Sequence, residues 1–204
     1  MTTTDETGRT SWAMSPRDLI NIGIFAALYI VVTFAINMLG FINPAIMLVS
    51  MCAAIVAGGV PFVLFLTRVT HAGMILVFAL MVSGLLVLTG HPPVSLAVTL
   101  VVAGVAELIV HRGGYRSPRS YVLAHAAYAV WYIGPWLPLF YDRDNHLESI
   151  GMDQMGASYS AKAESLLSVE LMAGFGASTI VFGLLGGLLG VRLLHKHFRR
   201  AGLA

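Results

Sequence analysis

Six long runs of apolar residues, separated by short polar connections, dominate the pattern of the 204-residue chain. Each run holds roughly 17 residues or more, which as an α-helix is long enough to cross about 30 Å of hydrocarbon. In that medium every backbone amide must be satisfied within its own segment, which favours helices over open strands. We therefore predict an all-α membrane protein with six transmembrane helices. The predicted spans are Asp18–Met38, Ala45–Leu66, Ala72–Leu88, Val94–Val110, Ser120–Phe140 and Leu166–Leu194.

The second run is interrupted by Gly58, Gly59 and Pro61. This pattern fits either a kinked single helix or two half-helices around a re-entrant turn. We favour the kinked helix, because an extra crossing would move the arginines of residues 112–119 to the opposite side of the membrane, against the charge bias described next.

Basic residues are distributed unevenly about the predicted spans. Of the twelve lysines and arginines, ten fall on the side of the membrane that carries the termini, and only Arg143 and Lys162 fall on the opposite side. Because cytoplasmic connections are enriched in positive charge, both termini are predicted to be cytoplasmic. We expect a flexible cytoplasmic tail over residues 1–16 and one membrane domain over 17–200. The residues on the cytoplasmic side are Arg9, Arg17, Arg68, Arg112, Arg116, Arg119, Arg192, Lys196, Arg199 and Arg200.

The composition agrees with a lipid environment. With 57% hydrophobic and 11% charged residues, the chain has too little polar surface to cover a soluble globule. The net charge of +2 arises mostly from the cytoplasmic rim and predicts no nucleic-acid partner, which would require a continuous basic face. The single Cys52 provides neither a disulfide framework nor a thiol metal site within this chain.

Several catalytic patterns are absent from the sequence. It has no phosphate-binding Gly-rich loop ending in Gly-Lys-Ser/Thr, no paired intramembrane carboxylates, no metalloprotease His-Glu pair and no nucleophile elbow. We weighed a metal site made of His91 with His146 or Glu170 and rejected it, since nothing in the sequence brings these residues together. The sequence therefore predicts no enzyme, no catalytic residue, no metal site and no cofactor.

The fifth run carries a stripe of polar and aromatic residues on one predicted helix face, because its members are three or four residues apart. Unpaired polar groups facing lipid are costly, so the stripe is expected to face protein or a cavity. Tyr128, Tyr132 and Trp136 are candidate ligand-stacking residues, and membrane-interface packing is the equally weighted alternative. For His125 we favour packing. The stripe consists of Tyr121, His125, Tyr128, Tyr132 and Trp136.

Further candidate ligand residues lie near the outer side. His91 is at the tip of the turn between the third and fourth runs, Glu170 is near the outer end of the sixth, and Met47 is in the second. Methionines suit a planar, moderately apolar ligand, although they are equally common in flexible packing. The outer segment 141–165 is longer than a simple connection needs, which favours a lid over a solvated linker.

Glu107 is the one carboxylate well inside a predicted span, near its cytoplasmic end. A buried charge needs a partner, and His111 or Arg68 is the expected one. We favour this structural pairing over a proton relay, because further ionisable groups across the bilayer are missing.

Small residues on two spans indicate close helix approach. In the last span the glycines at 183, 186, 187 and 190 are expected to pack inside the bundle. In the first span Gly23 and Ala27, four residues apart, leave a shallow groove for a helix of the same chain or of another.

Together these features resemble the substrate-binding S component of an energy-coupling factor (ECF) transporter, and more narrowly the Trep_Strep family. The resemblance covers Pro16–Arg200 and includes Gly58-Gly59-Val60-Pro61 and Leu88-Thr89-Gly90-His91. It implies a subunit of the bacterial or archaeal cell membrane that takes up a micronutrient. The implied partners are a transmembrane coupling (T) subunit and two cytoplasmic ATPases. The family commonly docks through alanines four apart on the first helix, which Gly23 and Ala27 match only as small residues, so the resemblance implies that these two dock the coupling subunit.

Two other functions remain open at this stage. One is an intramembrane lipid-modifying enzyme using Glu107, His125 or Glu170 as acid or base. The other is a structural membrane subunit without ligand. For the leading hypothesis, the aromatic residues favour a planar or moderately apolar ligand, such as a vitamin or a tetrapyrrole, over a polyanion.

Overall fold

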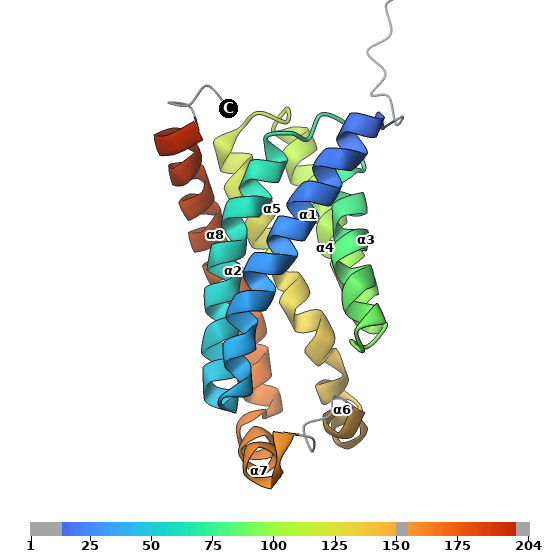
Figure 1. The fold of residues 1–204 in the computed structure, drawn as a ribbon, viewed down its shortest axis with the longest axis vertical. Coiled ribbons are helices and arrows are strands. Elements are labelled where there is room, and N and C mark those ends of the chain that lie inside the picture. Colours follow the sequence, from blue (N-terminus) through green and yellow to red (C-terminus); the bar gives the residue numbers. More distant parts are fainter. Residues whose placement is uncertain (1–13, 150–154, 199–204) are drawn as a thin grey trace, which may run out of the picture.

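The computed structural model describes residues 14–149 and 155–198, and this part of the chain is helical without strands. The predicted tail, 1–16, therefore lies outside the described residues except for its last three. Elements η1 and η2 are 3-10 helices and η4 is a π-helix. In chain order the elements are α1 (Pro16–Asn37), η1 (Met38–Phe41), α2 (Pro44–Leu66), α3 (Met74–Leu88), α4 (Val94–Arg112), α5 (Pro118–Ala129), η2 (Val130–Phe140), α6 (Arg143–Ser149), α7 (Ala157–Leu166), α8 (Val169–Leu193) and η4 (Leu194–Phe198) (Figure 1).

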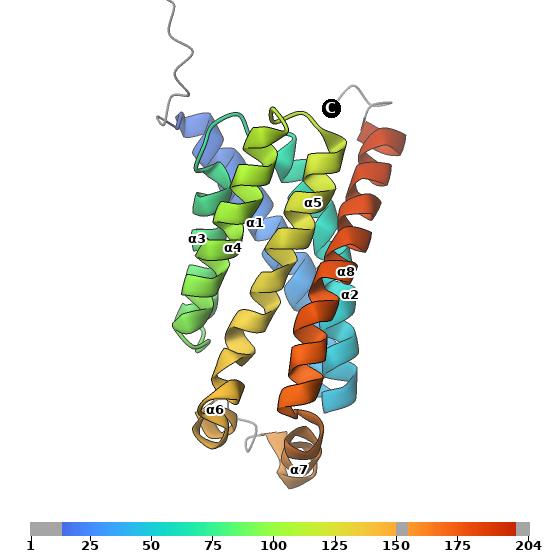
Figure 2. The same cartoon turned by 180° about the vertical axis from the view of Figure 1, so that it is seen from behind.

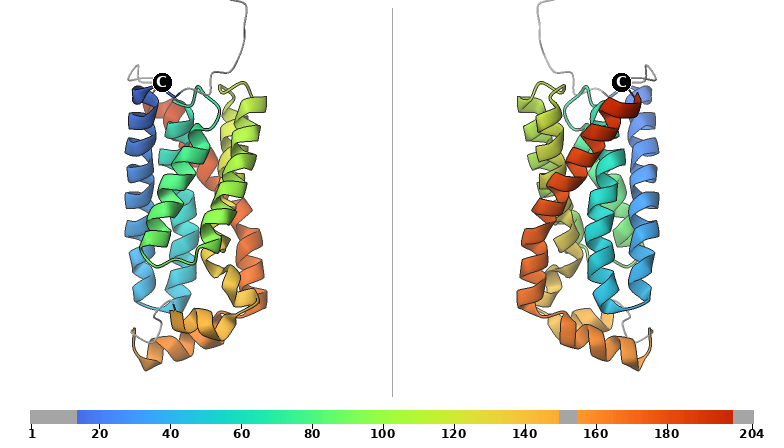
Figure 3. Two further views of the ribbon diagram at one scale, coloured as in Figure 1. Left: turned by 90° about the vertical axis from the view of Figure 1, so that its right-hand side faces the viewer. Right: turned by 90° about the vertical axis from the view of Figure 1, so that its left-hand side faces the viewer.

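The long helices form one bundle in which α2 packs against α1 and α8, and α5 packs against α4 and α8 (Figure 2). The start of α1, the end of α8 and the α2–α3 and α4–α5 connections lie at one end of the bundle. We call it the basic end, since Arg17, Arg68, Arg112, Arg116, Arg119, Arg192 and Lys196 belong to it. At the opposite, capped end, α6 and α7 lie across the bundle (Figure 3).

Within residues 14–149 and 155–198, four helical segments are long and apolar enough to cross a membrane, which supports a membrane protein. They are Pro16–Phe41, Pro44–Leu66, Val94–Arg112 and Val169–Lys196. Helix α3 has 15 residues, and the fifth predicted span divides into α5 and η2. The number of six spans and the cytoplasmic location of the termini therefore stay predictions.

The fifth predicted span differs from a single helix over Ser120–Phe140. Its α-helix begins earlier, at Pro118 behind the capping residue Ser117, and ends at Ala129. The chain then continues as an 11-residue 3-10 helix that contains Pro135 and Pro138. Proline lacks the amide proton and its ring clashes with the carbonyl four residues earlier, which explains the loss of α-helical bonding here. A 3-10 helix of this length is uncommon.

Helix α2 continues through Gly58, Gly59 and Pro61 without interruption. The single-helix part of the prediction is thus confirmed, the re-entrant alternative is wrong, and the kink stays a prediction. Gly59 faces the backbone of Gly186 on α8, so these two helices approach closely because neither residue has a side chain. Helix α8 also presents Gly183 and Gly187 to α5, which confirms the predicted packing role of its glycines.

The sixth predicted span also begins later than expected. Leu166 ends α7, and α8 begins at Val169 behind Ser168, whose hydroxyl accepts the N–H of Leu171 at 3.2 Å. The outer segment 141–165 is consequently not an extended linker. It folds into α6 and α7, apart from residues 150–154, which lie outside the described part.

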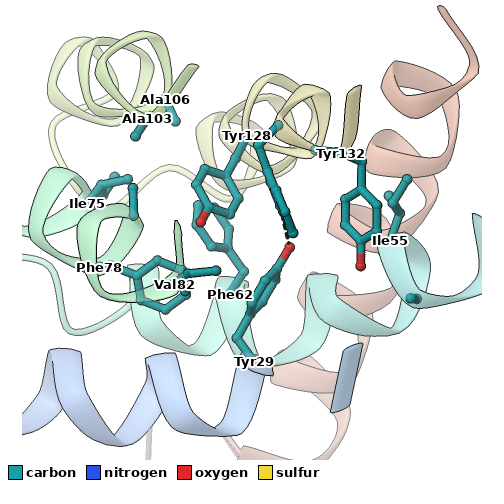
Figure 4. Close-up of a cluster of buried hydrophobic side chains, with 14 of the residues drawn as sticks. Tyr29, Ile55, Phe62, Ile75, Phe78, Val82, Ala103, Ala106, Tyr128 and Tyr132 are labelled. Carbon is teal, nitrogen blue, oxygen red and sulfur yellow. Dashed lines mark hydrogen bonds between the residues drawn. The ribbon is translucent and has the colours of Figure 1, made fainter. Parts of the chain in front are cut away.

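The centre of the bundle is aromatic. The rings of Phe62 and Tyr128 stack with centroids 4.6 Å apart and planes at 11°. Those of Phe65 and Phe78 stack similarly, at 4.7 Å and 17°. Figure 4 shows that Tyr29 from α1 meets this group beside Phe62 and Tyr128. These rings connect α1, α2, α3 and α5 into one core.

Candidate functional site

Polar and aromatic side chains gather inside the bundle where α5 passes into η2. We call this group the tyrosine cluster, defined as Tyr29, Asn37, Tyr128, Trp131 and Tyr132. Tyr29 and Asn37 are eight residues apart on α1 and so share a face of that helix. The four aromatic side chains are at most 6% exposed. The cluster therefore places hydroxyl, amide and indole groups in the interior of the bundle, where polar groups are usually satisfied or functional.

Contacts join the cluster across elements that are distant in sequence. Trp131 Nε1 donates a hydrogen bond to Tyr29 Oη at 2.9 Å. The side-chain amide of Asn37 lies 3.5 Å from Tyr132 Oη. The rings of Tyr29 and Tyr128 meet edge to face at 5.9 Å, and those of Trp131 and Tyr132 are tilted by 43° at 4.4 Å. The five side chains thus form one connected group between α1 and the α5–η2 junction, and Figure 4 shows three of them, Tyr29, Tyr128 and Tyr132.

Two buried polar atoms of this cluster have no hydrogen-bond partner among the described residues. They are Tyr128 Oη and Asn37 Oδ1. Leaving such a group unsatisfied costs about 1 to 3 kcal/mol, so buried polar groups are nearly always paired. Unpaired polar atoms beside aromatic rings make this cluster the candidate binding site of the described chain.

The cluster has no neighbouring carboxylate or ammonium partner. Among the described residues, the buried acidic side chains are Asp18 and Glu107, and no buried lysine or arginine occurs. Asp18 lies in the first turn of α1 at the basic end, where it forms a capping box with Ser15 and its Oδ2 lies 3.4 Å from His71 Nδ1. Glu107 caps α3 at the same end, as described below. The cluster is consequently uncharged.

The structure brings four of the predicted ligand residues near the cluster or the capped end. Tyr128 and Tyr132 belong to the cluster. Trp136 is half-buried on η2, with its ring 6.3 Å from that of His146 on α6, nearly perpendicular. Met47 is half-buried near the start of α2, and its Sδ lies 3.8 Å from Tyr159 Oη on α7.

The other two predicted ligand residues, His91 and Glu170, are not part of the cluster, although Glu170 also lies at the capped end. His91 is half-buried after α3, where its backbone N–H donates to Leu86 O at 3.0 Å and its Nδ1 lies 3.1 Å from the same oxygen. It thereby closes the end of α3. Glu170 is exposed in the first turn of α8. In the part of the chain that the structure describes, no three His, Cys, Asp or Glu residues are placed to hold a metal ion.

Helices α6 and α7 cover the capped end through buried contacts. Tyr159 on α7 donates its hydroxyl proton to the carbonyl oxygen of Gly40 at 2.9 Å. On α6, His146 and Leu147 are buried, and this helix packs against η2. The two helices of the predicted lid segment are therefore folded onto the capped end of the bundle, against η1, α2 and η2. That it opens stays a prediction.

Acid is expected to loosen α6. Burial lowers the pKa of His146 below its usual value, with nearby Asp142 opposing the shift. A base with a lowered pKa in the folded state favours the neutral form, so its contribution is present above about pH 6.5 and is lost as the pH falls below that value. Hydrogen exchange of the α6 amides, corrected for intrinsic rates, should accelerate between pH 7.5 and 5.5. A His146→Gln variant should lose this dependence. Equal dependence in both proteins would contradict the prediction.

The partner of Glu107 is the backbone of α3. Its Oε2 accepts the N–H of Ile75 at 3.0 Å, whereas the expected partner was the side chain of His111 or Arg68. The first residue before α3 is Gly73, which offers no capping side chain. The amides at a helix N-terminus attract an acceptor, so Glu107 takes the place of a local cap. The structural role agrees with the prediction. The hydrogen-bond partner is the backbone of α3, and the expected His111 adds a favourable electrostatic interaction.

His125 packs between helices, as predicted. It is fully buried, and its Nδ1 lies 2.8 Å from the carbonyl oxygen of Gly183 on α8. Since a carbonyl only accepts, Nδ1 carries the proton. The ring also lies 5.4 Å from that of Phe62 on α2. His125 therefore joins α5, α8 and α2.

Helix α1 lies at the outside of the bundle. Of the 18 most apolar consecutive residues in Pro16–Phe41, 22% are buried, whereas the corresponding share in α2 is 56%. Ala27 is exposed, and Gly23 is half-buried with Met81 of α3 as its nearest neighbour. The groove predicted at these two residues therefore opens at the surface. Exposed bulky residues surround Ala27 on the same face, namely Ile20, Ile24, Val31 and Phe34.

Sequence reasoning missed three members of the cluster: Tyr29, Asn37 and Trp131. The signal for the first two was present. Tyr29, Thr33 and Asn37 are spaced by four in an otherwise apolar run, which marks a polar stripe on one helix face. Trp131 was outside the stripe assumed for an α-helix, and the tighter 3-10 turn brings it inward.

A sequence-family model described as hypothetical bacterial integral membrane protein (Trep_Strep) matches residues 16–200. No curated protein and no solved structure gives a significant match to the chain.

Proposed function

We propose that this chain, which belongs to the Trep_Strep family of bacterial integral membrane proteins, is the substrate-binding subunit of an ECF-type importer. The observation that carries the proposal is the tyrosine cluster, with two unpaired polar atoms beneath a folded cap. Its ligand would be a micronutrient of vitamin-like, ring-containing chemistry. The chain has no recognisable ATP site, so the energy would come from partner subunits.

The proposed topology follows from charge. The basic end would face the cytoplasm, with both termini there, because positively charged connections are retained on that side. The capped end would then face outward. A ligand would enter from outside past α6 and α7, and bind at the α5–η2 junction. The partners would be a transmembrane coupling subunit and two cytoplasmic ATPases.

The exposed face of α1 would bind the coupling subunit. Gly23 and Ala27 leave a shallow site among bulky apolar residues, where the backbone of a partner helix can approach closely. An interface without buried charge can form and separate within the bilayer, which a transport cycle with repeated release requires.

An enzymatic role receives no support from the geometry, and we propose that the chain is not an enzyme. Glu107 caps α3, His125 bonds to α8, and Glu170 is exposed at the opposite end of the bundle from Glu107. An acid and a base acting on one substrate must lie within hydrogen-bond reach of it. A purely structural subunit would differ by retaining no ligand.

The proposal is tested by gentle purification of the protein together with its membrane partners. We expect native mass spectrometry to detect a retained small molecule, and co-purification to recover a transmembrane coupling subunit. A protein that retains no small molecule and recovers no such subunit would contradict the proposal. Cysteine labelling from each side of the membrane tests the topology. A cytoplasmic α7 would contradict import from the capped end.

Ala27→Trp is expected to reduce recovery of the coupling subunit about tenfold, which corresponds to about 1.4 kcal/mol of binding free energy. The indole remains compatible with lipid and fills the shallow site, so the partner helix is held away. Ala177→Trp, at an exposed alanine of α8, is the matched control and should leave recovery unchanged. Equal losses in both variants would indicate a general effect on the bundle and contradict docking at α1.

A further inference from the structure

We infer that the ligand is an uncharged, ring-containing molecule that forms hydrogen bonds with Asn37 and Tyr128. This inference rests on the proposed function and names the chemistry of the molecule that the same site binds. Three observations carry it: the absence of countercharge near the tyrosine cluster, the two unpaired polar atoms, and the aromatic rings beside them.

The absence of countercharge excludes a ligand bound through a full charge. A buried ion requires a partner, because transfer from water to the membrane interior is costly. The two buried carboxyl groups of the described chain, Asp18 and Glu107, are at the basic end and already bonded to Ser15 and Ile75. A carboxylate, phosphate or ammonium held at the α5–η2 junction would therefore lack an opposite charge.

The unpaired atoms define what the ligand must offer. Tyr128 Oη both donates and accepts, so it can bind either kind of group. Asn37 presents one end of its amide to Tyr132 and leaves the other end unpaired. Which end of the Asn37 side chain is oxygen and which is nitrogen is assigned from the hydrogen bonds that each end forms. In either orientation one strong donor or acceptor stays available. A ligand with both a donor and an acceptor, as in a lactam or carboxamide ring, satisfies both residues.

Ring contacts favour a flat ligand. The rings of Tyr29, Tyr128, Trp131 and Tyr132 touch one another edge to face or tilted, at centroid distances of 4.4 to 5.9 Å. Binding would exchange some of these ring–ring contacts for ring–ligand contacts of similar strength, so the hydrogen bonds would decide specificity.

Tyr128→Phe separates ligand binding from fold stability. The substitution removes only the unpaired hydroxyl, so the melting temperature of the ligand-free protein should stay the same or rise. Retention of the co-purified small molecule should fall about tenfold, the equivalent of one hydrogen bond. The matched control is Tyr121→Phe on the same helix. The hydroxyl of Tyr121 is not part of the cluster and donates a hydrogen bond to Tyr115 O at 2.7 Å. This control should leave retention unchanged.

Asn37→Asp tests the charge directly, since it keeps the size of the side chain and adds a carboxyl group. We expect Asn37→Asp to lose retention of the ligand that the wild-type protein binds.

The charge of the molecule retained by the wild-type protein is a second test. The molecule is extracted, and its charge is measured by ion-exchange chromatography at pH 7. An uncharged molecule supports the inference. A charged molecule, or full retention by Tyr128→Phe, overturns it while the proposed function stands. Absence of any retained molecule contradicts the proposed function instead.

Discussion

Substitution of Gly59 by alanine is expected to destabilise the bundle by about 3 kcal/mol, at the upper end of the usual effect of overpacking. A Cβ at this position would overlap the backbone carbonyl group of Gly186 on α8. Because the obstructing atoms are backbone, no side-chain rotation relieves the overlap, and the two helices must separate. Separation also affects Gly190, whose own Cβ would lie 2.6 Å from Gly59 O. Thermal unfolding in detergent measures the change.

Gly174→Ala is the control for this prediction. Gly174 lies on α8 as well, but an added Cβ there meets nothing within 4 Å. Alanine is the better helix former by about 1 kcal/mol, so this variant should be as stable as the wild type or slightly more stable. If Gly59→Ala were as stable as Gly174→Ala, the result would contradict the close approach of α2 and α8.

The same contact supports the candidate site. Gly58, next to Gly59, lets Tyr29 and Thr33 of α1 lie against α2, since a Cβ there would come within 2.9 Å of both side chains. Helix α2 is thus held between α8 and the stripe that carries Tyr29. We expect Gly59→Ala to weaken ligand retention together with stability, whereas Tyr128→Phe affects retention alone.

The sequence was sufficient for the helical class and most of the span boundaries, because a bilayer admits few alternatives to helices. The predicted second and fourth spans match α2 and α4 to within two residues. The break at Ala129 was harder to foresee. Pro135 and Pro138 were visible, but a proline does not determine how many residues before it an α-helix ends, and this helix ends at Ala129.

The candidate site was predicted in part, and the missing part is tertiary. Tyr128 and Tyr132 were identified from spacing on one helix. Their neighbours on α1 could not be assigned, since Trp131 and Tyr29 are 102 residues apart and no local pattern joins them. His91 was proposed as a ligand residue because it lies at the tip of a turn. In the structure its backbone N–H and its ring nitrogen Nδ1 both bond to Leu86 O at the end of α3. Ionisable residues in turns satisfy backbone groups as readily as ligands.

The substitution Glu107→Leu is expected to destabilise the protein by about 2 kcal/mol, the usual contribution of a hydrogen bond to a charged group. Leucine keeps the apolar contacts of the side chain but leaves the amide of Ile75 at the start of α3 without its acceptor. Gly73 offers no substitute cap. The loss should be local, so hydrogen exchange at the first turn of α3 should accelerate more than in α2 or α8.

Glu107→Gln distinguishes this capping role from catalysis. The amide oxygen of glutamine still accepts the Ile75 N–H, so this variant should recover at least half of the stability lost in Glu107→Leu. Glu164→Leu, at an exposed acidic residue of α7, is the control and should leave α3 unchanged. Ligand retention should be the same in Glu107→Gln and in the wild type, because Glu107 lies at the basic end and the tyrosine cluster lies at the α5–η2 junction. Turnover of a lipid substrate that is lost in Glu107→Gln would reverse the assignment, since a helix cap does not require an ionisable group whereas an acid or base catalyst does.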